Sequence, residues 1–197
     1  MGDQHCREAA GTAALQAQTT ATELFQIAAL ILGSEEEAIT MVEETVARAE
    51  IDPCADAGGA HDEARQRLVD FAVRRLAKLH PGAFAAPPSI EGTATCIETD
   101  DLSAAGLSTE QLDALFEGSG RAKMREWLDQ LAPAVRAIFV LRAVVGQDGE
   151  RTAQDLRRSG AVGAQGWQRE QVGTAYRQAL CSLATSLMSS NLLVSPA

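Results

Sequence analysis

The stretch LAPAVRAIFVLRAVVGQDGERTAQDLRRSG, residues 131–160, decides the fold class of this chain. Proline is tolerated at the start of a helix, so Pro133 can open an apolar helix over residues 133–145. Gly146 then interrupts the pattern, and a second, shorter helix is predicted over residues 150–158. Such a stretch either fills a core or belongs to a helix pair that enters a DNA groove.

The composition of the whole chain favours helices over strands. Hydrophobic residues make up 46% and charged residues 22% of the 197 residues, which is an ordinary balance for a globular protein. Aromatic residues make up only 4%, whereas Ala and Leu are abundant. No stretch alternates polar and apolar residues well enough to predict a strand. The sequence therefore predicts an all-α protein of one or two domains.

Apolar residues recur at helical spacing in the N-terminal part of the chain and predict three helices. Gly33 ends the first helix, and Ser34 with Glu37 forms a capping box that opens the second. A loop with two glycines over 52–60 follows the second helix, and Pro81 stops the third. The three helices are predicted over residues 21–32, 35–50 and 61–79. Their expected buried faces include Ile39, Val42, Val46 and Ala49 in the second, and Leu68, Phe71, Ala72, Leu76 and Leu79 in the third.

A change of composition divides the chain. Residues 81–107 mix Pro, Gly, Ser, Thr and acidic residues without a helical period, which predicts a linker. Ser108 and Gln111 form another capping box and mark the next helix. We therefore expect two small helical domains, 1–80 and 108–197, joined by this linker. The helices predicted in the second domain cover residues 108–116, 121–131, 133–145, 150–158 and 165–189.

The charge of the chain is uneven. Residues 1–118 contain 7 Lys and Arg and 21 Asp and Glu, a net charge of −14. Residues 119–197 contain 10 and 6, a net charge of +4, so that the whole chain carries −10. Bulk attraction of a polyanion is not favoured by this total. The asymmetry indicates two modules with different partners, and the alternative is chance surface composition.

The sequence contains no pattern typical of an enzyme or of a metal site. Its four cysteines lie far apart, without the spacing of zinc ligands, and its three histidines are scattered. Acidic neighbours such as Glu43 and Glu44 do not face each other on a helix, so they do not indicate an acid–base pair. There is no apolar signal core and no run long enough to cross a bilayer. We expect a cytoplasmic protein with reduced thiols, without catalytic activity, metal, cofactor or membrane contact.

The segment AITMVEETVARAE, residues 38–50, resembles the helix with which extracytoplasmic-function (ECF) sigma factors grip the clamp of core RNA polymerase. That helix often has the pattern A-E-D-L-V-Q-E-T-F-x-x-A. The residues that fit are Val42, Glu44, Thr45 and Ala49, and Arg48 stands where Arg is common. Thr40 stands where an acid is frequent, Glu43 replaces Gln and Val46 replaces an aromatic residue. The resemblance implies polymerase contacts by Thr40, Glu43, Glu44 and Arg48.

Residues 131–160 are similar to the C-terminal sigma domain, which recognises the upstream promoter element. The family pattern is L-P-x-x-x-R-x-V-F-x-L-R, then a glycine, then a helix-turn-helix. The residues in register are Leu131, Arg136, Ile138, Phe139, Leu141, Arg142 and Gly146. We expect Phe139 and Leu141 to be buried, Arg142 to lie nearer the surface, and Ala153 to occupy the small packing position of the first helix of the pair. The predicted DNA-binding residues are Arg157, Arg158, Gln165, Gln168, Arg169 and Arg177, since Arg pairs well with guanine and Gln with adenine.

The final helix departs most from the family, whose recognition helix is rich in Arg and Lys. Here it carries Arg169 and Arg177 against Glu170, and a glycine-rich turn precedes it. So few cationic contacts predict weak, salt-sensitive binding to promoter DNA. In the third helix, Phe71 is the one aromatic residue available to stack on a single-stranded base, and its place in the apolar stripe favours the core.

Three hypotheses follow from these patterns. The first is a sigma-factor-like initiation protein that binds core RNA polymerase and an upstream promoter element. The second is a degenerate sigma mimic, an adaptor that binds an anti-sigma regulator without promoter recognition. The third is a helical interaction protein unrelated to sigma factors. The charge of the final helix discriminates between the first two.

Overall fold

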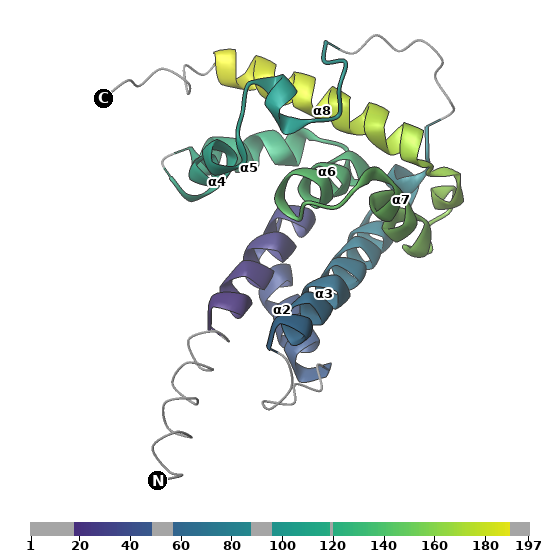
Figure 1. Ribbon diagram of the computed structural model, residues 1–197. Helices are drawn as coiled ribbons and strands as arrows, with labels where there is room; N and C mark the ends of the chain where they lie inside the picture. The colour runs from purple at the N-terminus through teal and green to yellow at the C-terminus, as the bar shows by residue number, and fades with distance from the viewer. Residues whose placement is uncertain (1–17, 49–56, 88–95, 119, 190–197) are drawn as a thin grey trace. The chain divides into compact units, whose positions relative to one another are not determined.

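The structure, a computed structural model, describes residues 18–48, 57–87, 96–118 and 120–189 (Figure 1). Within these ranges every regular element is helical and there is no strand, which confirms the all-α prediction. None of the described helices is long and apolar enough to span a membrane. The elements are a helix over 18–32, α2 (Glu35–Arg48), α3 (Ala57–Leu79), η1 (Pro81–Phe84), η2 (Leu102–Ala105), α4 (Thr109–Glu117), α5 (Arg121–Gln130), α6 (Pro133–Phe139), η3 (Val140–Val144), α7 (Gly149–Arg158), η4 (Ala164–Gly166) and α8 (Arg169–Ser189).

The chain divides into two compact units, Met1–Ala72 and Val73–Ala197. The boundary lies inside α3 and therefore upstream of the predicted linker, residues 81–107. The described parts of that stretch, 81–87 and 96–107, fall in the second unit, where Phe84, Ile97 and Leu107 are buried. These three residues are too far apart in the sequence to form a helical pattern of apolar residues. The sequence pattern therefore does not reveal that they are buried.

The break between the first two helices lies where the capping residues predicted. Gly33 has a left-handed φ of 74°, and its backbone N–H donates to the carbonyl of Ala29 at 2.9 Å, which ends the first helix. Ser34 Oγ accepts from the backbone N–H of Glu37 at 3.3 Å and caps α2. These contacts confirm the predicted break between the first two helices.

The buried face of α2 differs from the predicted one. Its buried residues are Ala38, Met41 and Thr45, whereas Ile39 is 51% exposed and Val46 is 46% exposed. Since each residue turns a helix by about 100°, a shift of one position moves the buried face to a neighbouring side. Thr45 can be buried because its hydroxyl donates to the carbonyl of Met41 at 2.8 Å. The prediction that Ile39 and Val46 are buried is therefore wrong, and Val42 is only half-buried.

The third helix is longer than predicted. α3 begins at Ala57, so the two glycines assigned to a loop lie in its first turn. Leu68, Ala72 and Leu76 are fully buried as expected, while Leu79 is 46% exposed at the end of the helix. Phe71 is half-buried. Glycine lowers helix propensity by only about 1 kcal/mol, which the packing of the rest of the helix offsets.

The core of the second unit forms where α6 and α7 pack on α8. Phe139 is fully buried, with its ring 4.8 Å from that of Trp127 and 6.1 Å from that of Tyr176. Leu141 is also fully buried and Arg142 is partly exposed, as predicted. The predicted helix over 133–145 is observed as α6 followed by a π-turn, in which the N–H of Val145 donates to the carbonyl of Val140 at 3.0 Å.

The family-pattern residue Arg136 is a buried ion-pair partner in this core. Its side chain is 8% exposed, and Nη1 donates to Asp129 Oδ1 at 3.0 Å. Burial lowers the pKa of Arg136, and the carboxylate of Asp129 opposes that shift. Arg136 thus holds α6 against the end of α5.

A disulfide joins Cys96 to Cys181, which lie 85 residues apart. The prediction of reduced thiols is therefore wrong for these two cysteines. Tertiary packing brings Cys96 onto α8, where Cys181 lies. The spacing of the cysteines in the sequence therefore does not predict this disulfide.

The titration of Tyr176 tests the packing of this core, because it is the chain's single tyrosine. Burial raises its pKa to about 12, Arg142 opposes the shift, and Asp101 and Asp100 add to it. We expect tyrosinate absorbance to appear near pH 12 in the folded chain, but at about 10 in urea. Since the unfolded chain ionises first, the stability due to the neutral phenol is complete below about pH 10 and is lost as the pH rises towards 12. A folded-state midpoint of about 10 would contradict this packing.

Candidate nucleic-acid interface

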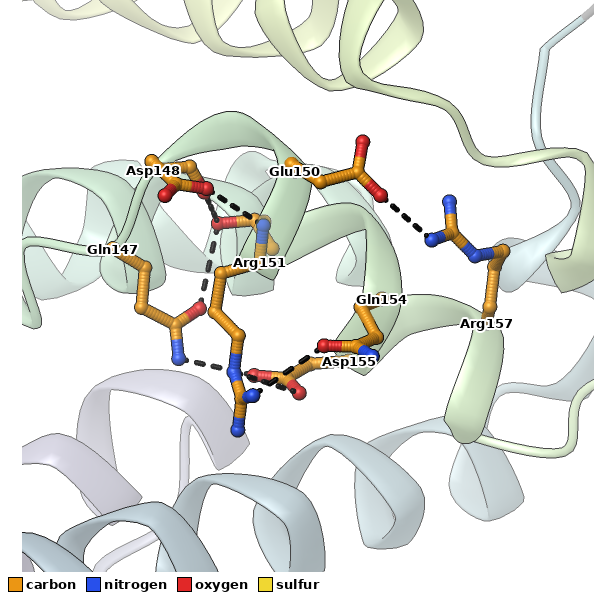
Figure 2. A network of polar contacts seen from close by, with 8 residues as sticks. Gln147, Asp148, Glu150, Arg151, Gln154, Asp155 and Arg157 are labelled. Atoms are coloured by element: carbon orange, nitrogen blue, oxygen red, sulfur yellow. Dashed lines mark hydrogen bonds and ion pairs between the residues drawn. The ribbon is translucent and has the colours of Figure 1, made fainter.

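A polar network holds the first helix of the predicted pair, α7. Asp148 caps it by accepting from the backbone N–H of Arg151 at 2.7 Å. Asp155, which is 1% exposed, accepts from Gln147 Nε2 at 3.0 Å, and Arg151 Nε lies 3.6 Å from its other oxygen. Figure 2 shows Gln147 and Arg151 converging on this carboxylate. The side chain of Arg151 therefore makes its contacts within α7.

The connection between α7 and α8, residues 159–168, is hydrogen-bonded to residues far away in the sequence. Trp167 is buried, and its indole N–H donates to the carbonyl of Phe84 at 2.9 Å. The N–H of Ala86 donates to the carbonyl of Gly163 at 3.1 Å. A typical helix-turn-helix has a turn of three or four residues, so this ten-residue connection is longer. The hydrogen bonds to residues 84–86 hold this long connection in place.

The last helix begins at Arg169, four residues later than predicted. Gln165 lies instead in the turn η4, and its side-chain amide donates to the carbonyl of Arg157 at 3.0 Å. Gln168 precedes the helix, where its backbone N–H donates to the side chain of Gln171 at 3.2 Å. Trp167 is buried with an extended backbone, so α8 starts only after it. A Cβ added at Gly149 would lie 3.3 Å from Cγ of Arg169. The start of α8 therefore lies beside the start of α7.

The predicted DNA-binding residues fall into two groups. Four of them are exposed in or beside the connection, namely Arg158, Gln165, Gln168 and Arg169. Arg157, by contrast, donates to the carbonyl of Trp167 at 2.7 Å. It also donates to Glu150 at 3.0 Å, as Figure 2 shows. Arg177 is half-buried and donates to Thr174 Oγ1 at 3.1 Å. Arg157 and Arg177 are thus used within the fold.

The predicted polymerase-binding residues lie on α2, in the other unit. Thr40, Glu43 and Glu44 are exposed, as expected for the two acids. The side chain of Arg48 is outside the described part of the structure. Two apolar residues not expected at this surface, Ile39 and Val46, are exposed beside these acids. Their helical spacing predicted a buried face instead, so the sequence carries no signal of their exposure.

Comparison of the chain with protein-family models, curated proteins and solved structures finds no match. Within the described residues, no three or more His, Cys, Asp or Glu side chains are grouped to hold a metal ion. The candidate site is therefore defined by its own geometry, as two helix ends that meet with polar side chains exposed between them.

Glycine substitutions test the anchoring of the connection. Gly160 and Gly163 both have left-handed φ values, 77° and 79°, so alanine at either costs about 1–2 kcal/mol. A Cβ at Gly160 meets nothing within 4 Å, whereas at Gly163 it lies 2.8 Å from Cβ of Ala85. We expect Gly163→Ala to lower the free energy of unfolding by about 1–3 kcal/mol more than Gly160→Ala. Urea unfolding followed by tryptophan fluorescence measures the difference, and equal losses would contradict the anchoring.

Proposed function

We propose that this chain is a sigma-factor-like initiation protein that binds core RNA polymerase through α2 and an upstream promoter element through α7 and α8. The observation that carries the proposal is the meeting of the two helix starts. Ala153 is fully buried, and Gln168 and Arg169 are exposed where α8 begins. In a helix-turn-helix protein the start of the second helix contacts base edges in the major groove.

The charges at this site support weak binding to DNA. Arg151, Arg157 and Arg177 are each hydrogen-bonded within the second unit. Arg158 and Arg169 are exposed, and neither forms an ion pair with an acidic side chain of the described residues. Two phosphate contacts correspond to a slope of about −2 for log affinity against log salt concentration. We therefore expect binding that is measurable at low salt and strongly weakened at physiological salt.

A second candidate function, the adaptor without promoter recognition, is favoured by two observations. The connection between α7 and α8 is longer than a helix-turn-helix turn, and Arg157 is held by Trp167 and Glu150. Such an adaptor would bind an anti-sigma regulator. Absence of duplex binding at about 50 mM salt, where counterion release favours binding most, would favour this candidate.

Substitution of Arg169 tests promoter recognition. If Arg169 contacts a guanine, Arg169→Ala loses about 1–3 kcal/mol of binding and relaxes specificity at one base pair. Lys123→Ala is the matched control, because it removes one exposed positive charge from α5. Fluorescence anisotropy with a panel of duplexes selected from random sequence measures both effects. Equal losses in the two variants would contradict base recognition by Arg169.

Charge reversal on α2 tests binding to the polymerase. Glu43→Lys with Glu44→Lys should weaken binding to core polymerase at least tenfold, which corresponds to about 1.4 kcal/mol. The physical reason is that both carboxylates are exposed beside Ile39 and Val46, so a partner there would meet acid and apolar groups together. Glu117→Lys with Glu126→Lys makes the same charge change on exposed residues of the second unit. If the first pair binds core as tightly as the second, α2 is not the docking surface.

A further inference from the structure

An acidic segment, residues 96–107, is attached to the face of the second unit that includes α8. The helical turn η2 within it packs on α8, and Ile97 and Leu107 are buried. At its start, Cys96 is bonded to Cys181 of α8. The exposed residues between these anchors include Glu98, Asp100 and Asp101. We call this segment the acidic strap.

The acidic strap pairs with an arginine side chain of the second unit. Asp100 accepts twice from Arg142 Nη2, through Oδ2 at 3.0 Å and through its backbone carbonyl at 3.1 Å. A Cβ placed on Gly173 of α8 would lie 3.8 Å from Asp100 Oδ2 and 3.5 Å from Arg177 Nη1. The carboxylate therefore pairs with Arg142 and faces Gly173 of α8, where it occupies the position that an anionic ligand of Arg142 would need.

One covalent bond determines how strongly the acidic strap is held. Closing a tether raises the effective concentration of the tethered group, so the disulfide favours the contact between Asp100 and Arg142 without adding a contact of its own. Cys96 is exposed and Cys181 is half-buried, so the bond is accessible to a thiol reductant. The anchors that remain after reduction are Ile97, Leu107 and the ion pair of Asp100.

We propose that the Cys96–Cys181 disulfide is a redox-controlled clasp that holds the acidic strap on α8. A dithiol reductant attacks one sulfur, and the resulting mixed disulfide is resolved by the reductant's second thiol. The chain gains two electrons and two protons as two thiols, and the reductant becomes a disulfide. The strap then detaches more often, and Arg142 becomes available to anions. The consequence for DNA rests on the proposed function, in which the second unit binds promoter DNA.

Hydrogen exchange tests the clasp itself. The full chain carrying Cys6→Ser and Cys54→Ser retains Cys96 and Cys181 alone, so a reductant acts on this pair only. We expect dithiothreitol to speed amide exchange in peptides from 96–107 about tenfold or more, and α6 to remain protected. Cys96→Ser in the same background should reproduce the reduced state without reductant. Unchanged exchange in 96–107 on reduction and in Cys96→Ser would overturn the proposal.

Duplex binding separates the clasp from the proposed function. With a random-sequence duplex at about 50 mM salt, reduction and Asp100→Asn should each raise affinity several-fold, whereas Glu98→Gln should leave it unchanged. If reduction speeds amide exchange in 96–107 but neither redox state binds the duplex, the clasp proposal stands and DNA binding is overturned. Equal duplex binding by the oxidised, reduced and Asp100→Asn proteins overturns the release of Arg142, and leaves DNA binding standing.

Discussion

The buried indole of Trp167 is the constraint on which the candidate site depends. Its N–H is satisfied by the carbonyl of Phe84, and its own carbonyl accepts from Arg157 at the end of α7. One residue therefore joins η1, α7 and the start of α8. Because a buried donor without a partner costs about 1–3 kcal/mol, this arrangement resists rearrangement. The position of Gln168 and Arg169 follows directly from it, since they are the next two residues along the chain.

The positive charges of the second unit are used largely inside it. Arg136, Arg142 and Arg157 each hold two elements together through hydrogen bonds to an acidic side chain or a carbonyl. The disulfide adds a constraint of a different kind, because closing a loop of 85 residues stabilises a fold by about 4–5 kcal/mol in the chain-entropy account. The net charge of +4 over residues 119–197 therefore overstates what this part of the chain offers to DNA.

Local signals made most of the helices predictable. Both arms of the capping box of Ser108 and Gln111 are present at the start of α4, and Gly33 ends the first helix. The start of α8 was missed because Trp167 is held by Phe84, a partner 83 residues away. The disulfide and the engagement of Arg142 by Asp100 were missed for the same reason. Sequence periodicity also placed the wrong face of α2 inside, since Thr45 becomes compatible with burial only once its hydroxyl bonds to Met41.

Candidate site residues were predictable by type, but their availability was not. Gln168 and Arg169 are exposed, whereas Arg157 is engaged by neighbours that only the folded chain brings to it. Association with core RNA polymerase tests most directly whether this chain acts as a sigma-like protein. The full chain is mixed with purified core enzyme at about 1 μM of each and separated by size-exclusion chromatography. If it does, we expect one-to-one co-elution that an excess of a known sigma factor abolishes. Separate elution at low salt, in both redox states, would contradict it.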